Sequence, residues 1–341
     1  MQKLDIQEAL LKKVETKLNV DVKLVDALVD VLNISQDAAY RRMSGKVALT
    51  IFETQILVDT YDLTLGNLGT YKKDKIIFDY KPLSHIDFNF ESYLTGLRDN
   101  LREIKFLKNP ELFISINETP VFQLFNFPHL TRFLFFFWAK SYLQINEYKD
   151  AKFKREKIDK KVLSIGIETH NLYNSFPSTE LYCPETLKGI LRQIDYYYET
   201  GVFEDNQYAL ELLDNLSGLA KHINHQAEVG HKFVVGNEPN KADQTKFKMY
   251  VLDTYLPDNT YYIKHDEGAL TYFSHNIMNF IMTKNPEYNA DTKLILDRLL
   301  DNSVLISETG AKERSKFFVA LEKANDKLRK KIQFAIELED S

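Results

Sequence analysis

The clearest chemistry in this sequence is hydrogen bonding by the stretch SQDAAYRRMSGK, residues 35–46. Glutamine and arginine can make paired hydrogen bonds with base edges, and arginine, lysine and serine can hold phosphate oxygens. Residues 36–46 carry three positive charges, on Arg41, Arg42 and Lys46, against one negative charge on Asp37. These residue types suit either a helix that enters DNA or an ordinary exposed helix, and the neighbouring elements must decide between the two.

Two helices are predicted ahead of this stretch. Apolar residues at helical spacing indicate the first helix over about 5–18 and the second over about 24–32. Asn19 or Asp21 is expected to cap the second helix. Asn33 is expected to end it, because asparagine tolerates the left-handed conformation that often follows a helix.

The stretch itself is predicted to be a short helix followed by a further capped helix. Ser35 is expected to cap it, and Gly45 to end it after Met43. Thr50 and Glu53 have the spacing of a capping box, so the next helix is predicted to begin directly after Thr50. The residues of that next helix expected to face inward are Ile51, Ile56, Leu57 and Tyr61.

The spacing of apolar residues also predicts which side of the short helix is exposed. Ala39 and Met43 are four residues apart and share a face, so both are expected to pack inward. The opposite side then faces outward, with Gln36 at the exposed N-terminal end. The outward residues are Asp37, Tyr40, Arg41 and Ser44.

This order of elements resembles the helix-turn-helix of the Cro/phage-repressor family, the xenobiotic-response-element-type transcriptional regulators. The matching segments are LVDVLNIS, QDAAYRRMSGK and LTIFETQILVDTYDLTLGNL, and the resemblance covers about one fifth of the chain. It implies that the short helix lies in the major groove of a double-stranded DNA operator, with Gln36 and Arg41 at base edges. The implied DNA-binding residues are Ser35, Gln36, Asp37, Tyr40, Arg41, Arg42, Ser44 and Lys46.

Charge argues for a dimer rather than for a strongly attracting single copy. The formal net charge is −5, and residues 1–70 contain eight Lys or Arg against ten Asp or Glu. A single copy is therefore expected to bind nucleic acid poorly, because no overall field draws it to phosphate. A homodimer would double the local positive patch.

The composition predicts a mainly α protein in several parts. Apolar residues make up 44% of the chain, and helix-breaking Gly and Pro number only 12 and 9. We expect a five-helix helix-turn-helix domain over 1–70 and a connector over 71–87. A helical effector or oligomerisation region is expected over 88–232, and an α+β region over 245–341.

Strands are expected in only a few places. The segments KFKMYVLDTYL, TYYIKH and ALTYF predict a small antiparallel β-meander near 246–274, and ELFISI at 111–116 predicts an isolated strand. A helix is predicted to begin at Pro184, because proline suits the first helical position. Helices are expected to resume at His275 and again near Asp291, and the last, over about 311–338, is the longest.

This last helix is one candidate for dimerisation. Its apolar residues follow the spacing of coiled-coil core positions, with Asn325 where a buried asparagine pair can fix the register. The alternative is a single amphipathic helix packed on its own domain. The candidate dimerisation residues are Phe318, Leu321, Asn325, Leu328 and Ile332.

Other segments contain residue types that can bind ligands. The aromatic-rich segments NFPHLTRFLFFFWAKSYL and RQIDYYYETGVF are consistent with core packing or with a pocket for a small-molecule or peptide effector. The basic run YKDAKFKREKIDKK reads as a solvated surface, with contact to DNA flanks as the alternative. A metal site is not expected, although four spaced residues could supply ligands: His222, His225, Glu228 and His231.

The expected function is therefore that of a one-component, sequence-specific transcriptional regulator that acts as a homodimer. No catalytic residue and no cofactor are predicted, because the sequence has no phosphate-binding glycine loop, nucleophile elbow or His-Glu-x-x-His motif. The absence of a signal peptide pattern and of a long apolar segment predicts a cytoplasmic protein without membrane contact. The alternatives are a helical head that docks on another protein and, ranked third, an enzyme in the C-terminal part.

Overall fold

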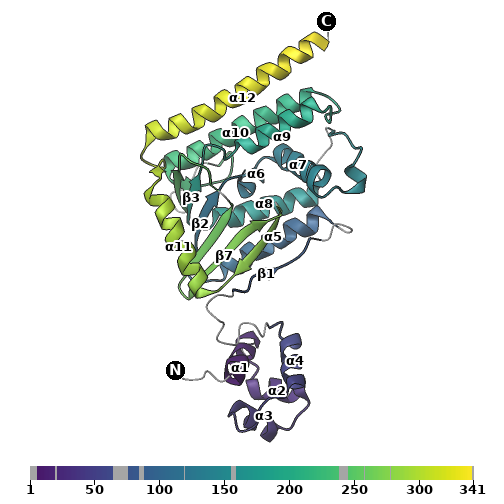
Figure 1. Ribbon diagram of the computed structural model, residues 1–341, viewed down its shortest axis with the longest axis vertical. Coiled ribbons are helices and arrows are strands. Elements are labelled where there is room, and N and C mark those ends of the chain that lie inside the picture. Colours follow the sequence, from purple (N-terminus) through teal and green to yellow (C-terminus); the bar gives the residue numbers. More distant parts are fainter. Residues whose placement is uncertain are drawn as a thin grey trace. The chain divides into compact units, whose positions relative to one another are not determined.

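A computed structural model describes the chain in two compact units, formed by residues 1–77 and 78–341 (Figure 1). The described residues are 6–19, 21–63, 76–83, 88–118, 120–154, 159–237, 245–256, 258–276 and 278–339. Each unit has a separate hydrophobic core. No helix among the described residues is both long enough and apolar enough to cross a bilayer.

The N-terminal unit contains four described helices. They are α1 (Ile6–Lys17), α2 (Leu24–Leu32), α3 (Gln36–Met43) and α4 (Ile51–Thr60). The fifth helix expected before residue 70 lies outside the described residues. The four helices enclose a small core of buried side chains: Leu10, Leu11, Val14, Val25, Leu28, Ala39 and Leu57.

The local signals around α3 are confirmed. Asn33 ends α2 in the left-handed conformation with φ 50°, and the Ser35 side chain accepts a hydrogen bond from the backbone N–H of Ala38. Thr50 and Glu53 form the expected capping box at the start of α4. The predicted cap of α2 at Asn19 or Asp21 is wrong, because α2 begins only after Lys23, which makes no side-chain cap.

The predicted inward face of α4 is only partly correct. Leu57 is fully buried, but Ile51 is 79% exposed, and Ile56 is also exposed. Phe52 beside them is 78% exposed. Apolar residues lie on several sides of this helix, so their spacing alone does not identify the side that meets the core.

The larger unit is built on one mixed sheet. Its strand order is β1-β8-β7-β6-β2-β3-β5-β4, and β9 pairs with β5. Strands β2, β3 and β5 are parallel to one another, whereas the other pairs are antiparallel. The strands are β1 (Asp79–Tyr80), β2 (Glu111–Ile116), β3 (Ser178–Tyr182), β4 (His231–Lys232), β5 (Thr245–Val251), β6 (Thr260–His265), β7 (Gly268–His275), β8 (Asn279–Thr283) and β9 (Val304–Leu305).

The prediction of a mainly α fold with a small meander is therefore wrong. The protein is 57% helical and 15% strand, and its described strands form a nine-stranded mixed sheet. Strand β2 is not isolated but lies between β6 and β3, buried along nearly its whole length. A short run buried on both faces cannot be told from a helix segment by its periodicity. Strand β3 was missed because Ser178 and Glu180 are buried polar residues, which interrupt the apolar run expected of a strand buried on both faces.

The predicted meander has the wrong members. Strand β5 leaves the group and pairs in parallel with β3, while β6 pairs with β2 and β7. The consecutive antiparallel strands are β6, β7 and β8, and β8 occupies the region in which a helix was expected to resume at His275. Local sequence patterns suggest that strands adjacent in sequence pair with each other. Here β5 pairs instead with a strand that is distant in sequence.

Helices cover the sheet mainly on one face. These are α5 (Phe90–Lys105), α6 (Val121–Leu124), α7 (Pro128–Phe137), α8 (Lys160–Asn174), α9 (Lys188–Glu199) and α10 (Gln207–Val229). A π-helix, η2 (Trp138–Tyr142), continues α7, and a 3₁₀-helix, η3 (Asn146–Tyr148), follows it. Helix α11 (Pro286–Asp301) packs against the opposite face, where Leu296 meets Phe113 and Tyr262.

The final helix α12 (Ala311–Glu339) confirms the expected long helix but overturns its candidate role in dimerisation. It lies along α10 and α9, at the outer side of the helical layer (Figure 1). Asn325 Nδ2 donates to the carbonyl of Leu213, 2.9 Å away. The candidate residues Phe318, Leu321, Asn325, Leu328 and Ile332 are all buried within this unit. They are thus occupied by intramolecular packing, the alternative left open for this helix.

We predict that Leu321→Ala lowers the free energy of unfolding of the larger unit by about 2–5 kcal/mol, because it leaves a cavity between α12 and α10. Denaturant titration measures this loss, and light scattering on the native protein should show an unchanged mass. Val319→Ala, on an exposed position of the same helix, is the control. A dimer that dissociates in Leu321→Ala without loss of stability would restore the coiled-coil interpretation.

Candidate functional site

Helix α3 is held on the N-terminal unit by three contacts. The first is Ala39, which is fully buried in the core. Met43, expected to share this role, is exposed at the C-terminal end of the helix. The inward face of α3 is therefore narrower than its sequence pattern suggests.

The second contact is an ion pair between α3 and α4. Arg42 Nη2 and Nε lie 2.5 and 3.1 Å from Glu53 Oε1, and Nη1 donates to the carbonyl of Ala38 at 3.1 Å. Both charged side chains are only 15% exposed. Arg42 and its hydrogen bonds lower the pKa of the Glu53 carboxyl. The expectation that Arg42 holds a DNA phosphate is therefore corrected, because its guanidinium is committed inside the unit.

The third contact comes from Gln7 on α1. Its Nε2 donates to the carbonyls of Arg42 and Val47 at 2.7 and 2.9 Å, and its Oε1 accepts from the N–H of Leu49 at 2.7 Å. One amide thus fixes the loop between α3 and α4. Residue spacing gave no signal of this contact, since Gln7 is more than thirty positions away from each partner.

The outer side of α3 carries the other predicted residues together. Arg41 and Asp37 form an ion pair at 2.9 Å with 60% and 72% of their side chains exposed. The Ser35 side-chain oxygen accepts from the backbone, which leaves its hydroxyl hydrogen for another partner. The Ser44 hydroxyl donates to the carbonyl of Arg41 at 3.2 Å. The exposed set is Ser35, Gln36, Asp37, Tyr40, Arg41, Ser44 and Lys46.

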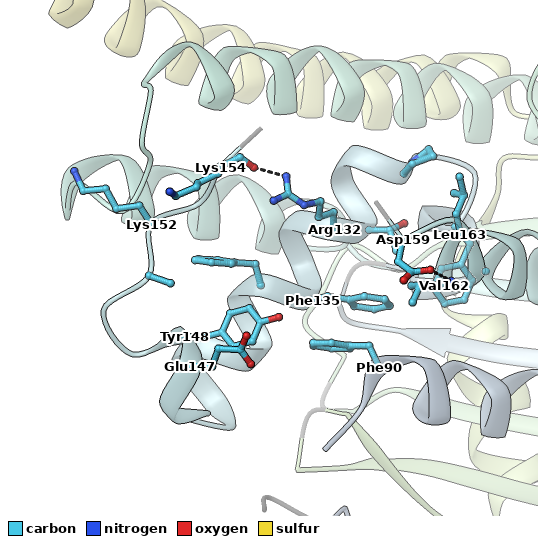
Figure 2. Close-up of a pocket in the computed structure, with 16 residues that line it drawn as sticks. Phe90, Arg132, Phe135, Glu147, Tyr148, Lys152, Lys154, Asp159, Val162 and Leu163 are labelled. Carbon is cyan, nitrogen blue, oxygen red and sulfur yellow. Dashed lines mark hydrogen bonds between the residues drawn. The ribbon is translucent and has the colours of Figure 1, made fainter. Parts of the chain in front are cut away.

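In the larger unit, the aromatic-rich segment and the basic run line one cavity of about 350 Å³. Figure 2 shows Phe90 and Phe135 together at its base, with Tyr148 and Glu147 on one side and Lys152, Lys154 and Arg132 above them. The Phe90 and Phe135 rings stack with centroids 4.5 Å apart. An apolar base below cationic side chains could accept a small amphipathic ligand.

The rim of this cavity is held by two cations from α7 and η2. Lys140 Nζ donates to three carbonyls, those of Tyr148, Lys149 and Ala151, at 2.6 to 3.1 Å. Arg132 donates to the carbonyl of Lys154 (Figure 2).

A buried polar network lies between the helices and the sheet. The Glu180 carboxyl accepts hydrogen bonds from Tyr173, Ser178 and Tyr182. Lys232 Nζ donates to the carbonyl of Tyr173 at 2.9 Å and lies 3.9 Å from the centre of its ring. Burial lowers the pKa of Lys232 to about 7. Sequence reasoning missed this network, because its polar residues belong to no recognisable motif.

The four residues considered as metal ligands do not form a metal site. His222 is buried, its ring Nε2 lies 3.0 Å from Gln226 Nε2, and burial lowers its pKa to about 4. The rings of both His222 and His225 pack edge-on against Phe233. Across the described residues, no group of three or more His, Cys, Asp or Glu has the geometry to hold a metal ion.

We predict that Arg42→Met destabilises the N-terminal unit by about 3 kcal/mol, because it leaves Glu53 partly buried without its cation. Hydrogen exchange in α3 and α4 of the full chain measures the loss, with Arg41→Met as the control, since an exposed pair contributes about 0–1 kcal/mol. The lowered pKa of Glu53 means that the pair stabilises the unit above the ordinary carboxyl range. This stabilisation is lost as the pH falls through the lowered pKa. Equal protection in the two variants would contradict the prediction.

We predict that Lys232 makes stability rise with pH above about 7. The folded protein releases this proton near pH 7, whereas an unfolded lysine keeps it up to about pH 10.4, so the unfolded state binds more protons between these values. The melting temperature of Lys232→Met should therefore fall relative to that of the wild type as the pH rises from 7 to 9. Lys221→Met, an exposed lysine of α10, is the control. A pH-independent difference would argue against an uncharged buried lysine.

Comparison with known proteins gave no match: no protein-family model fits the chain, and no curated protein or solved structure resembles it significantly. The function is therefore inferred from the residues and their geometry.

Proposed function

We propose that the N-terminal unit binds a double-stranded DNA operator through α3, and that the chain is a one-component transcriptional regulator acting as a homodimer in the cytoplasm. One observation carries the proposal. Helix α3 is fixed from within by Ala39, Arg42 and Gln7, while its outer side presents side chains able to form hydrogen bonds. A helix held rigidly with a polar outer side is what insertion into the major groove requires.

The outer residues suggest how bases would be read. Gln36, at the N-terminal end of α3, suits the N6/N7 edge of adenine, and Arg41 suits the O6/N7 edge of guanine. Arg41 must first release Asp37, which costs little, because an exposed ion pair contributes only about 0–1 kcal/mol. A good paired contact to a base contributes about 1–3 kcal/mol of discrimination. Asp37, once released, can accept from the amino group of a cytosine.

Phosphate contacts fall to the residues at the ends of α3. Ser35 has a free hydroxyl hydrogen, and Lys46 is exposed in the loop after the helix. With Arg42 committed to Glu53, fewer cations remain for phosphate than the sequence alone suggests. Two copies on half-sites about 34–36 Å apart would compensate for the weak attraction of one copy.

The larger unit is proposed to carry dimerisation and effector binding. Its buried α12 positions are occupied, so a dimer would use another surface. Its cavities offer room for a small effector, and no catalytic step is assigned to it.

A protein-docking head is the second candidate, favoured by one specific feature. Ile51 and Phe52 at the start of α4 are largely exposed, and Ile56 is exposed nearby. Adjacent exposed apolar side chains of this size are common in protein interfaces.

We predict that the full chain enriches a sequence from a genomic DNA pool and that Arg41→Ala loses preference at one base pair, at a cost of about 1–3 kcal/mol. Quantitative sequencing of bound DNA at two salt concentrations measures both effects. Lys12→Ala is a matched control, because Lys12 forms a similarly exposed i,i+4 ion pair with Glu8 on α1.

The DNA proposal fails if a demonstrated dimer shows neither enrichment nor salt-dependent binding. Loss of a protein partner in Phe52→Ser, together with intact behaviour of Arg41→Ala, would instead favour the docking head.

A further inference from the structure

A second cavity lies at the carboxyl ends of two parallel strands in the larger unit. It has a volume of about 460 Å³. Asn117 and Glu118, which follow β2, line one side, and Glu185, which follows β3, lines another. The carboxyl ends of parallel strands are a common place for ligand-binding residues in α/β sheets. The position of the cavity therefore matches a common ligand-binding place.

Two irregular pieces of backbone border this cavity. Helix α7 continues into the π-helix η2, which places Trp138 and Tyr142 on the cavity wall. Leu187, between β3 and α9, has a φ of 73° although it is a bulky, fully buried residue. Left-handed backbone costs energy for such a residue, and both irregularities are enriched at functional sites.

The strained turn also explains why α9 does not begin at Pro184 as predicted. The helix starts at Lys188, after a turn of four residues. This delay leaves Glu185 in the turn and brings Arg192 within 2.6 Å of it. The turn thus fixes one ion pair of the cavity wall.

The charges around the cavity leave one carboxyl without a cation. Arg192 is paired with Glu185, whereas no ion pair of Glu118 is found among the described residues. Glu118 is oriented by Asn259, whose side-chain oxygen accepts from the backbone N–H of Glu118 at 3.2 Å and whose Nδ2 lies 3.4 Å from Glu118 Oε2. Glu118 is an exposed residue, and the protein atoms that surround part of its carboxyl raise its pKa, because they displace water from the charged form.

Several of the other residues that line this cavity are aromatic. Trp138 lines the cavity and is buried, whereas Tyr142, Tyr196 and Tyr255 are exposed to solvent. Aromatic rings attract organic cations through their negative faces, and a carboxylate adds a direct charge partner. An anionic ligand would instead meet the uncompensated Glu118.

We propose that this cavity binds a small organic ammonium ion, whose charge pairs with Glu118 and whose apolar body packs against Trp138 and the neighbouring tyrosines. The volume suits a small ligand of this kind. The proposal concerns the larger unit alone. It gives the proposed effector a chemical class, but binding can be measured without DNA, so its failure is separate from failure of the DNA proposal.

Trp138 is the single tryptophan of the chain, so its fluorescence reports directly on this cavity. The probes are phenethylammonium, the neutral 2-phenylethanol and the anionic 3-phenylpropionate, titrated into the full-length protein at constant ionic strength, with calorimetry as a second readout. We expect saturable binding of phenethylammonium at least about tenfold tighter than of the other two. That ratio corresponds to about 1.4 kcal/mol.

Three variants locate the site. Glu118→Gln should weaken phenethylammonium binding about tenfold and leave the weak binding of 2-phenylethanol unchanged. Tyr196→Leu, at an exposed position, should also weaken binding of the cation. This variant keeps the test valid if Glu118→Gln does not fold. Glu147→Gln, a glutamate of the other cavity, is the matched control and should bind like wild type.

The proposal is overturned if none of the probes gives saturable binding by fluorescence or calorimetry. It is equally overturned if the neutral or anionic probe binds as tightly as the cation, or if folded Glu118→Gln and Tyr196→Leu both retain wild-type affinity.

Discussion

Parallel pairing of β2, β3 and β5 is the constraint on which the larger unit depends. Parallel neighbours cannot be joined by a tight turn, so the chain must travel back across the sheet between them. These returns are the segments that contain α6 to α8 and α9 to α10, which form most of the helical layer. The same pairing aligns the ends of β2 and β3, and it thereby brings Glu118 and Glu185 to one cavity.

The buried carboxyl of Glu180 and the buried amine of Lys232 lose their contact with water, and hydrogen bonds within the network replace it. Its carboxyl is satisfied by three hydroxyl groups, and Lys232 is satisfied by a carbonyl and an aromatic ring. Burial of a polar group costs free energy unless its hydrogen bonds are made inside the protein. The network ties α8 and β4 to β3, so it helps to hold the helical layer on the sheet.

In the N-terminal unit, order at α3 comes from contacts that span the unit. The ion pair of Arg42 with Glu53 joins α3 to α4, and Gln7 joins α1 to the loop between them. These two contacts satisfy the hydrogen-bonding groups on the inner side of α3 within the unit. The outer side of the helix remains polar and accessible. The arrangement supports recognition by a rigid helix. Because Arg42 is paired with Glu53, fewer positive charges can contact a polyanion than the number of arginines in α3 suggests.

The sequence by itself determined the features that depend on neighbours within a few residues. The left-handed Asn33, the Ser35 cap, the Thr50 and Glu53 capping box and the long helix α12 were all predictable, because each rests on interactions inside one turn or one helix. Only the tertiary structure decided the roles of Arg42 and of the α12 core positions, whose partners lie elsewhere in the chain. It also decided the sheet, since the pairing of β2 with β3 and β6 depends on segments more than sixty residues apart. Local patterns set which segments can be helix or strand, whereas burial of a common core selects which of them meet.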